Sequence, residues 1–187
     1  MSDVSRGRLL NLFKSRAFSF GHFKLASGKE STYYINSKKA LFHSESVALL
    51  GEALWDLTHD LNIQAVGGLE VGAIPMATAT VLHYHRQGRA LEGFFVRKQV
   101  KEHGSQERIE GVLPVGARVA VVDDVLTTGG SALQAVQEVE RAGAHVVAVV
   151  CIVDRLEGAR AVFSPKYEYR PIFTIRDFGI DAPTGER

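Results

Sequence analysis

The order of apolar and polar stretches predicts an α/β domain with a parallel sheet. From residue 64 onward, short apolar runs of strand length alternate with stretches in which apolar residues recur at helical spacing. Residues 145–153, HVVAVVCIV, are almost continuously apolar, as expected for a parallel strand that is covered on both faces. Residues 118–142 combine a β-branched apolar run, a glycine-rich turn and an amphipathic helix. Because ligands of parallel sheets bind at the carboxyl ends of the strands, we expect a site in the turns that follow them.

The amino-terminal segment, about residues 1–40, departs from this alternation and is expected to cap the carboxyl edge of the sheet. A short amphipathic helix is predicted over residues 4–16. Residues 17–23 are aromatic and broken by a glycine, and residues 24–36 contain a turn followed by a strand. No repeat or low-complexity tract separates this segment from the rest, so residues 1–187 are expected to form a single domain.

The elements beyond this cap follow from apolar spacing and from residues that start or break helices. Ser44 or Ser46 is expected to cap a helix that runs to about residue 60. Pro75 is expected to open the next helix, because proline suits the first turn. The stretch from 100 to 111 is polar and shows no apolar period. The remaining predicted elements are strands at 64–69, 91–96, 118–122, 145–153 and 167–177, and helices at 75–87, 131–142 and 157–163.

Composition places the chain among ordinary globular proteins. It has 187 residues, of which 45% are hydrophobic and 23% charged, and its net charge is +1. This balance argues against a general nucleic-acid or membrane surface, and no apolar run reaches membrane-spanning length. The start of the chain lacks the apolar region of a secretory signal, and the single cysteine, Cys151, fits a reducing compartment. We therefore expect a cytoplasmic protein.

Two adjacent carboxylates end the strand at residues 118–122 and precede the turn TTGGS at residues 127–131. Glycines let the backbone approach a ligand closely, and the free N–H groups at the start of the following helix suit a phosphate. The turn is not a P-loop, since no GKS or GKT follows the glycines. Carboxylates repel phosphate, so Asp123 and Asp124 need another purpose, which holding two neighbouring sugar hydroxyls, directly or through Mg²⁺, would supply. The alternative is an ordinary strand–helix turn with a capping Ser or Thr.

A cluster of cationic side chains follows the strand at residues 91–96. Arg97, Lys98, Lys101 and His103 lie within the sequence RKQVKEHG. The alternative is a solvated charged loop, but this one begins at a strand end and is too long and polar for a simple connection. Cationic loops of this kind are used to close over phosphates and to exclude water.

The stretch VVDDVLTTGGS resembles the phosphoribosyl-pyrophosphate (PRPP) signature of type I phosphoribosyltransferases, and RKQVKEHG is similar to the catalytic loop of the orotate phosphoribosyltransferases in that family. The resemblance implies a parallel sheet flanked by helices, with a small amino-terminal hood. It implies that Asp123 and Asp124 bind the ribose 2- and 3-hydroxyls, that the turn binds the 5-phosphate, and that the loop contacts pyrophosphate in the partner subunit. The residues it assigns to PRPP are Arg97, Lys98, Lys101, His103, Asp123, Asp124, Val125, Leu126, Thr127, Thr128, Gly129, Gly130 and Ser131.

Two further stretches resemble the same family less specifically. GGLEVGAIP at residues 67–75 matches a turn that contacts pyrophosphate through its backbone, although many family members have a lysine where this chain has Gly72. Residues 24–36 resemble the orotate-binding segment, in which an SG pair precedes paired aromatics, here Tyr33 and Tyr34.

Arg155 follows the strand at residues 145–153 in the sequence VDR, which matches the family at this position. The resemblance implies that Arg155, together with Thr127, binds orotate. An arginine can bind a carboxylate through two parallel hydrogen bonds, which suits that role. The alternative is an arginine that pairs with Asp154 or Glu157.

The resemblance implies transfer of the 5-phosphoribosyl group from PRPP to orotate, giving orotidine 5′-phosphate and pyrophosphate on the route to UMP. Lys101 and Asp124 are the expected catalytic residues, and Mg²⁺ is the expected cofactor, bound mainly through PRPP and not by a separate protein metal site. The expected assembly is a homodimer with shared active sites, without nucleic-acid or membrane partners. The alternatives are another purine or pyrimidine phosphoribosyltransferase, and a regulatory protein that senses PRPP.

Overall fold

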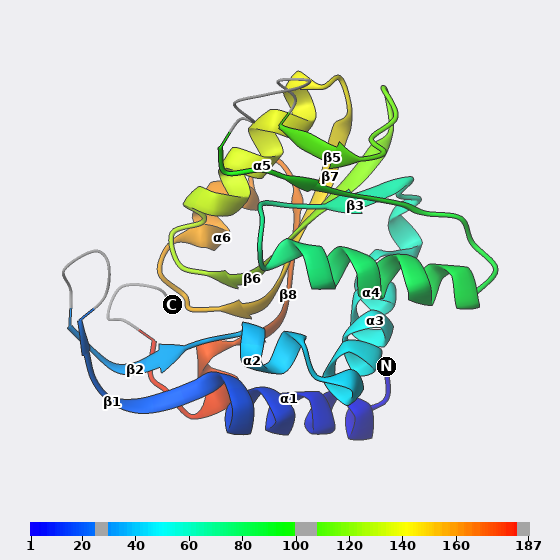
Figure 1. Cartoon of the computed structure of the whole chain (residues 1–187). Helices are drawn as coiled ribbons and strands as arrows, with labels where there is room; N and C mark the ends of the chain where they lie inside the picture. The colour runs from blue at the N-terminus through cyan, green and yellow to red at the C-terminus, as the bar shows by residue number, and fades with distance from the viewer. Residues whose placement is uncertain (25–29, 100–107, 183–187) are drawn as a thin grey trace.

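The computed structural model describes residues 1–24, 30–99 and 108–182. Its central strands are β3 (Ala65–Gly67), β4 (Glu92–Val96), β5 (Ile109–Gly111), β6 (Arg118–Leu126), β7 (His145–Asp154) and β8 (Glu168–Thr174). They form one six-stranded sheet in the order β5-β4-β3-β6-β7-β8 (Figure 1). Neighbouring strands from β4 through β3, β6 and β7 to β8 are all parallel, and only β5 is antiparallel to its neighbour, β4. The predicted α/β class with a parallel sheet is therefore confirmed.

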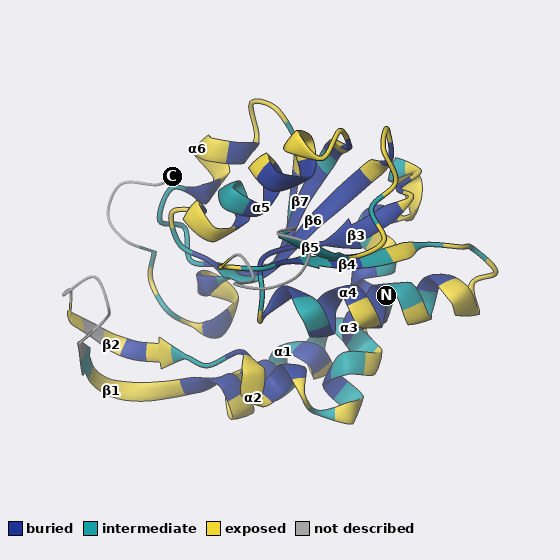
Figure 2. Cartoon of the chain, turned by 45° about the horizontal axis from the view of Figure 1, so that its top comes forward, coloured by how far each residue is buried: buried dark blue, intermediate teal, exposed yellow. Residues whose placement is uncertain are grey.

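Helices cover both faces of this sheet (Figure 1). These are α3 (Ser44–Thr58) and α4 (Ala73–Arg86) on one face and α5 (Gly130–Arg141) and α6 (Ala159–Phe163) on the other; two further helices, α1 (Asp3–Ala17) and α2 (Lys38–Leu41), belong to the amino-terminal segment. Alternate residues of β6 reach the two sides: Ala120 and Val122 join the core that includes α3 and α4, whereas Val119 and Val121 join the core that includes α5. Figure 2 shows the central strands β6 and β7 as mostly buried, which explains why their sequence is apolar without alternation. No helix in the described ranges is long and apolar enough to cross a membrane.

The amino-terminal segment lies below the sheet in Figure 1 and consists of α1, the antiparallel pair β1 (Phe18–Lys24) and β2 (Glu30–Ile35), and α2. The side chain of Ser2 caps α1 by accepting the N–H of Ser5 at 3.1 Å. The ring of Phe18 stacks on that of Phe178, in the 3₁₀ turn after β8, with 4.3 Å between their centroids. This contact joins β1 to the last segment of the described chain.

The structure differs from the predicted elements at several points. The strand predicted at 167–177 ends at Thr174, and a 3₁₀ helix follows at residues 175–178. The short helix α2 was not predicted. A short edge strand, β5, forms within the stretch expected to lack periodic structure; its three residues are too few to show an apolar alternation. The residue before α3 is His43, so Ser44 and Ser46 lie inside the helix, and neither is its cap. The central strand extends to Leu126, so both predicted strand-ending acids belong to β6 itself.

Candidate active site

A sharp turn joins β6 to α5 at the carboxyl edge of the sheet. Gly129 adopts a left-handed φ of 87°, and a Cβ there would lie 2.7 Å from Cε2 of Phe163. Only glycine meets both requirements. Thr128, Gly130 and Ser131 are exposed, so the start of α5 is accessible from solvent. The unbonded N–H groups and the positive end of the helix dipole favour an anion at this point.

The two carboxylates near the end of β6 lie in different environments. Asp123 is only 6% exposed, and its Oδ1 accepts the N–H of Asp124 at 2.9 Å. Burial, followed by the neighbouring charge of Asp124, raises the pKa of Asp123 well above its usual range. Asp124 is more open, and its Oδ1 accepts the N–H of Val125 at 3.0 Å. A cation or a set of hydroxyl donors bound at this pair would favour the ionised form of Asp123.

The amino-terminal segment supplies both a donor and a cation to Asp124. The hydroxyl of Ser37 donates to Oδ2 of Asp124, and the ammonium nitrogen of Lys38 lies 3.6 Å from the same oxygen. Ser37 is buried, whereas the side chain of Lys38 is 52% exposed. The sequence analysis missed both residues. The signal that could have found them is the pair of lysines, Lys38 and Lys39, directly after the predicted orotate-binding strand.

The turn that follows β3 packs against the end of β6. A Cβ on Gly68 would lie 2.0 Å from a carbonyl oxygen of β6, and a Cβ on Gly72 would lie 2.5 Å from Cγ of Asp124. The backbone of this turn is therefore so close to the carboxylate of Asp124 that only glycine fits at position 72. A lysine at position 72, which the family resemblance associates with this turn, does not fit here unless Asp124 moves.

Arg97 and Lys98 leave the carboxyl end of β4 beside the same turn. Nη1 of Arg97 lies 3.4 Å from Oε1 of Glu110, and the N–H of Lys98 donates to Oε1 of Glu70 at 2.8 Å. Glu70 thus ties the turn after β3 to the residues that follow β4. The side chain of Lys98 is exposed, so its charge is available at the carboxyl edge.

Arg155 stands at the end of β7 between an acid and an aromatic ring. Its Nε lies 2.8 Å from Oε1 of Glu157, and its Cζ lies 4.8 Å from the ring centroid of Tyr33. The ion pair that the sequence analysis left open as an alternative is therefore formed with Glu157. Stacking on Tyr33 also joins Arg155 to β2, the strand that resembles an orotate-binding segment. A planar carboxylate ligand could replace Glu157 at this guanidinium.

Most but not all of the residues expected to bind PRPP lie in the part of the chain that the structure describes. Residues 123–131 form one continuous strand end, turn and helix start. Leu126 is buried, and its carbonyl accepts the N–H of Arg155 at 2.9 Å, so its side chain is unavailable to a ligand. Lys101 and His103 lie outside the described residues, and their contacts with pyrophosphate stay predictions.

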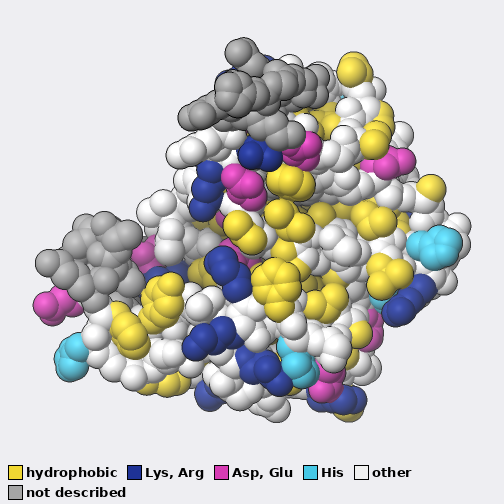
Figure 3. Space-filling model, viewed as in Figure 1, with side chains coloured by type: hydrophobic (Ala, Val, Ile, Leu, Met, Phe, Trp, Pro, Cys, Tyr) yellow, Lys and Arg dark blue, Asp and Glu magenta, His cyan; other side chains and the backbone are white. Residues whose placement is uncertain are grey.

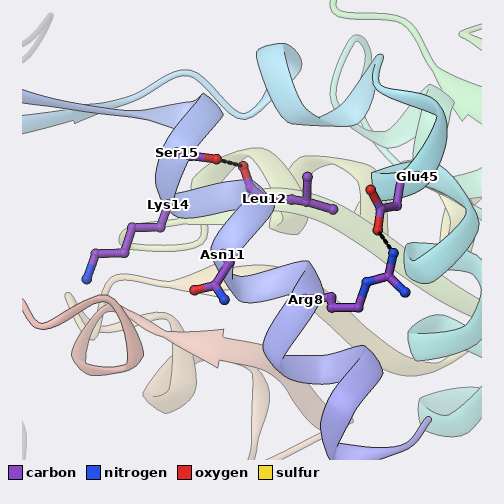
Figure 4. A pocket seen from close by; sticks show the side chains of 6 residues that line it. All are labelled: Arg8, Asn11, Leu12, Lys14, Ser15 and Glu45. Atoms are coloured by element: carbon purple, nitrogen blue, oxygen red, sulfur yellow. Dashed lines mark hydrogen bonds and ion pairs between the residues drawn. The ribbon is translucent and has the colours of Figure 1, made fainter.

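Two other features add nothing to this site. Among residues 1–24, 30–99 and 108–182, no group of three or more His, Cys, Asp and Glu side chains could hold a metal ion. A hollow of about 510 Å³ lies between α1 and the start of α3 (Figure 4). In it Arg8 pairs with Glu45, and the hydroxyl of Ser15 donates to the carbonyl of Leu12 at 3.3 Å. The hollow is lined by these two helices alone, and none of its lining residues belongs to the predicted site.

A carboxylate pair before a glycine turn, on a parallel sheet with a cationic segment beside it, is the arrangement of a protein that binds a phosphorylated sugar. A family model described as phosphoribosyl transferase domain matches residues 39–183. The chain therefore belongs to the phosphoribosyltransferase family.

Within this family the similarity is to orotate phosphoribosyltransferases. The orotate phosphoribosyltransferase of Streptomyces avermitilis is 48% identical over 183 residues, which cover 97% of this chain and 100% of the relative. The solved Mycobacterium tuberculosis H37Rv orotate phosphoribosyltransferase in complex with Fe(III) dicitrate has a TM-score of 0.84 and 40% identity, covering 94% of this chain and 99% of its own. The same M. tuberculosis enzyme in complex with PRPP has a TM-score of 0.80 and 36% identity, covering 94% of this chain and 99% of its own.

Proposed function

We propose that this protein transfers the 5-phosphoribosyl group of PRPP to orotate, forming orotidine 5′-phosphate and releasing pyrophosphate, a step toward UMP. The observation that carries the proposal is the Asp123–Asp124 pair near the end of β6, directly before the glycine turn that opens α5. The orotate phosphoribosyltransferases at 48% and 40% identity support orotate as the acceptor. The relative solved in complex with PRPP supports PRPP as the donor.

The ribose and its 5-phosphate are assigned to the end of β6 and the start of α5. Asp123 and Asp124 accept hydrogen bonds from the ribose 2- and 3-hydroxyls, and a sugar hydroxyl takes the place of the Ser37 hydroxyl at Asp124. Residues 127–131 bind the 5-phosphate through backbone N–H groups and hydroxyls. Held at both ends, the ribose presents its C1 atom in a fixed orientation.

The pyrophosphate is assigned to the cationic segment after β4. Arg97 and Lys98 lie beside the turn after β3, and Lys101 and His103 complete the set by resemblance to the family. As the bond between C1 and the pyrophosphate oxygen breaks, negative charge grows on pyrophosphate and positive charge on the ribose ring. These cations stabilise the first charge, and Asp124 lies where it can stabilise the second.

The acceptor is assigned to the end of β7. Arg155 binds the carboxylate of orotate in place of Glu157, and the ring of Tyr33 packs against its guanidinium group. Thr127, in the neighbouring turn, also contacts orotate. N1 of orotate then forms the bond to C1 on the face opposite to the departing pyrophosphate. The reaction needs no covalent bond to the protein.

Mg²⁺ fits this site as a partner of PRPP. Asp123 and Asp124 lie together near the end of β6, and proteins commonly bind Mg²⁺ through one or two carboxylates together with phosphates of the substrate. When bound, Mg²⁺ would reduce the negative charge of the pyrophosphate group.

A homodimer with shared active sites belongs to the proposal. An apolar groove of about 830 Å³ runs between α4, β4 and β5, and Leu82, which lines it, is 47% exposed. Figure 3 shows hydrophobic side chains gathered over the front of the molecule, where Figure 1 places α4. Exposed apolar patches mark interaction surfaces. A second copy seated in this groove would lie next to β4, the strand from which Arg97 and Lys98 emerge.

We also propose that one domain carries the whole site, with about residues 1–40 as its cap, and that the enzyme works in the cytoplasm. The cap supplies Ser37 and Lys38 to Asp124, which argues against an independent amino-terminal unit. The single cysteine, Cys151, is buried in β7, as suits a protein of a reducing compartment.

The test is the loss of orotate absorbance on mixing the protein with orotate, PRPP and Mg²⁺. Orotidine 5′-phosphate and pyrophosphate should appear in equal amounts. Turnover with adenine, hypoxanthine or uracil but not with orotate would make the protein a different phosphoribosyltransferase. PRPP binding without turnover of any base would make it a PRPP sensor.

A further inference from the structure

A buried carboxylate outside the predicted site connects α5 to the segment that carries Arg97 and Lys98. Glu138 lies in the last part of α5 and is 8% exposed, although it is charged. Its Oε1 accepts Nη1 of Arg108 at 2.6 Å, and its Oε2 accepts Nη1 of Arg141 at 2.5 Å. Burial alone would raise the pKa of Glu138, but hydrogen bonds from Arg141 and Arg108 outweigh it and lower the pKa below its usual range. The carboxylate is therefore ionised and held by two guanidinium groups.

Arg108 links Glu138 to the backbone of the segment after β4. Its Nη2 donates to the carbonyl of Lys98 at 2.8 Å, while its own carbonyl accepts the N–H of Arg97 at 2.8 Å. One guanidinium thus bridges α5 and the backbone of Lys98. The side chain of Glu70 holds the N–H of Lys98 from the other side, at 2.8 Å. Lys98 is fixed through both of its backbone polar groups.

α5 is a rigid connection between this bridge and the phosphate-binding turn. Ala132, Ala135, Val136 and Val139 bury one face of the helix against the sheet. The first residue of the helix, Gly130, belongs to the turn, and Glu138 lies about 12 Å further along the helix axis at 1.5 Å per residue. The position of Lys98 relative to the turn is therefore set by α5 through Glu138 and Arg108.

We propose that Glu138 and Arg108 are positioning residues that fix Arg97 and Lys98 at the distance from the α5 turn that PRPP requires. The proposal rests on the proposed function, since it assigns the two cations to pyrophosphate and the turn to the 5-phosphate. Neither positioning residue touches the substrate. Their loss impairs ligands that contact the turn and the cations together, and spares ligands that contact the turn alone.

The test compares Glu138→Gln and Arg108→Lys with Glu140→Gln as the matched control. Glu140 lies on the same helix and accepts hydrogen bonds from Lys166 at 3.0 Å and Tyr167 at 2.9 Å, away from the bridge. Each test variant should lower kcat/KM for PRPP about tenfold or more, the size expected for a lost hydrogen bond to a charged group. The dissociation constant for ribose 5-phosphate, which lacks pyrophosphate, should stay within about twofold, as should every constant of the control.

A double variant separates this pair from two independent residues. Because Glu138 reaches Lys98 only through Arg108, combining both substitutions should lower kcat/KM little more than either alone. Wild-type kcat/KM in a folded Glu138→Gln protein would overturn the proposal, and so would a parallel loss of ribose 5-phosphate affinity, which a merely structural role predicts. If Glu138→Gln does not fold, Arg108→Lys decides by the same two constants. Failure of the wild-type protein to use orotate would refute the proposed function alone, because binding of pyrophosphate and ribose 5-phosphate still tests the bridge.

Discussion

The ammonium nitrogen of Lys38 lies 3.6 Å from Oδ2 of Asp124, so a lysine of the amino-terminal segment faces the carboxylate pair of β6. Burial and the charge of Asp124 raise the pKa of Asp123, and the charge of Lys38 opposes that shift. Removing this cation should raise the pKa of Asp123 further, so a larger fraction of Asp123 is protonated at a given pH. Lys38→Met should therefore move the acidic limb of kcat/KM for PRPP to higher pH.

The matched control for this prediction is Lys39→Met. Lys39 is the exposed neighbour of Lys38 in α2, and its replacement removes the same charge from the same helix. Its pH profile should coincide with that of the wild type. Equal shifts in the two variants would mean that overall charge, and not the contact with Asp124, sets the profile.

Asp123→Asn should stabilise the protein increasingly as pH rises. The pKa of Asp123 is raised to about 8 by burial and by Asp124, whereas an aspartate in an unfolded chain titrates at about 3.9. Between these values the folded state holds a proton that the unfolded state has released, so wild-type stability falls as pH increases. Asparagine does not titrate, so the variant lacks this pH-dependent loss of stability. Urea unfolding at pH 5 and pH 8 should show a variant advantage that grows with pH, while activity is lost with the ribose contact.

Asp177→Asn provides a control of opposite sign for this titration. Burial alone would raise the pKa of Asp177, but hydrogen bonds from Thr174 and Arg6 outweigh it and lower the pKa. Its carboxylate therefore stabilises the folded state above the unfolded pKa, and its loss should destabilise the protein at neutral pH. For the test variant itself, a pH dependence of stability in Asp123→Asn equal to that of the wild type would refute the raised pKa of Asp123.

Arg155→Ala should weaken orotate much more than PRPP. The loss of a charge-assisted contact to a carboxylate costs about 1.5–3 kcal/mol, or roughly tenfold to more than a hundredfold in affinity. Separate KM values for the two substrates measure the difference. Glu157→Gln removes the ion-pair partner but keeps the guanidinium, so it should leave orotate binding nearly intact. Equal losses for both substrates in Arg155→Ala would identify a structural arginine.

Mixing two inactive variants should restore activity if the active sites are shared between subunits. Lys101→Ala and Asp124→Asn chains would combine so that one site of each heterodimer carries both lesions and the other carries neither. About half of the molecules are heterodimers after free exchange, so activity should approach about a quarter of the wild-type value. The control mixes Asp123→Asn with Asp124→Asn, whose lesions fall in the same half of each site, and should stay inactive. A Lys101–Asp124 mixture that exchanges subunits without gaining activity would show that the sites are not shared.

The sequence predicted the elements whose residues repeat a local pattern. The run at 145–153 became β7, the amphipathic stretch after Gly129 became α5, and the glycine turn between β6 and α5 lies where its composition placed it. These elements are specified by neighbouring residues, so a single sequence contains the information. The edge strand β5 was missed because it consists of three residues in a polar stretch.

The contacts that shape the site were harder to predict because they join distant parts of the chain. Ser37 reaches Asp124, and Glu138 reaches Arg108, through the packing of separate elements. Each of these residues occupies an unremarkable position in the sequence: a serine after a strand, and a glutamate among other polar residues of a helix. Only the fold shows that Glu138 is buried with two arginines and that Asp123 and Asp124 differ in exposure.

The close approach of Gly72 to Asp124 also restricts the order in which this sequence can evolve. A Cβ at position 72 would lie 2.5 Å from Cγ of Asp124, and Ser37 and Lys38 hold the same carboxylate from the other segment. A lysine at position 72 would have to follow a change that first moves Asp124, because the reverse order passes through an ancestor in which the side chain at position 72 overlaps the Asp124 carboxylate. We therefore expect glycine at position 72 and a cation in α2 to be inherited together, and lineages with a lysine in the turn to have lost the constraint on Lys38.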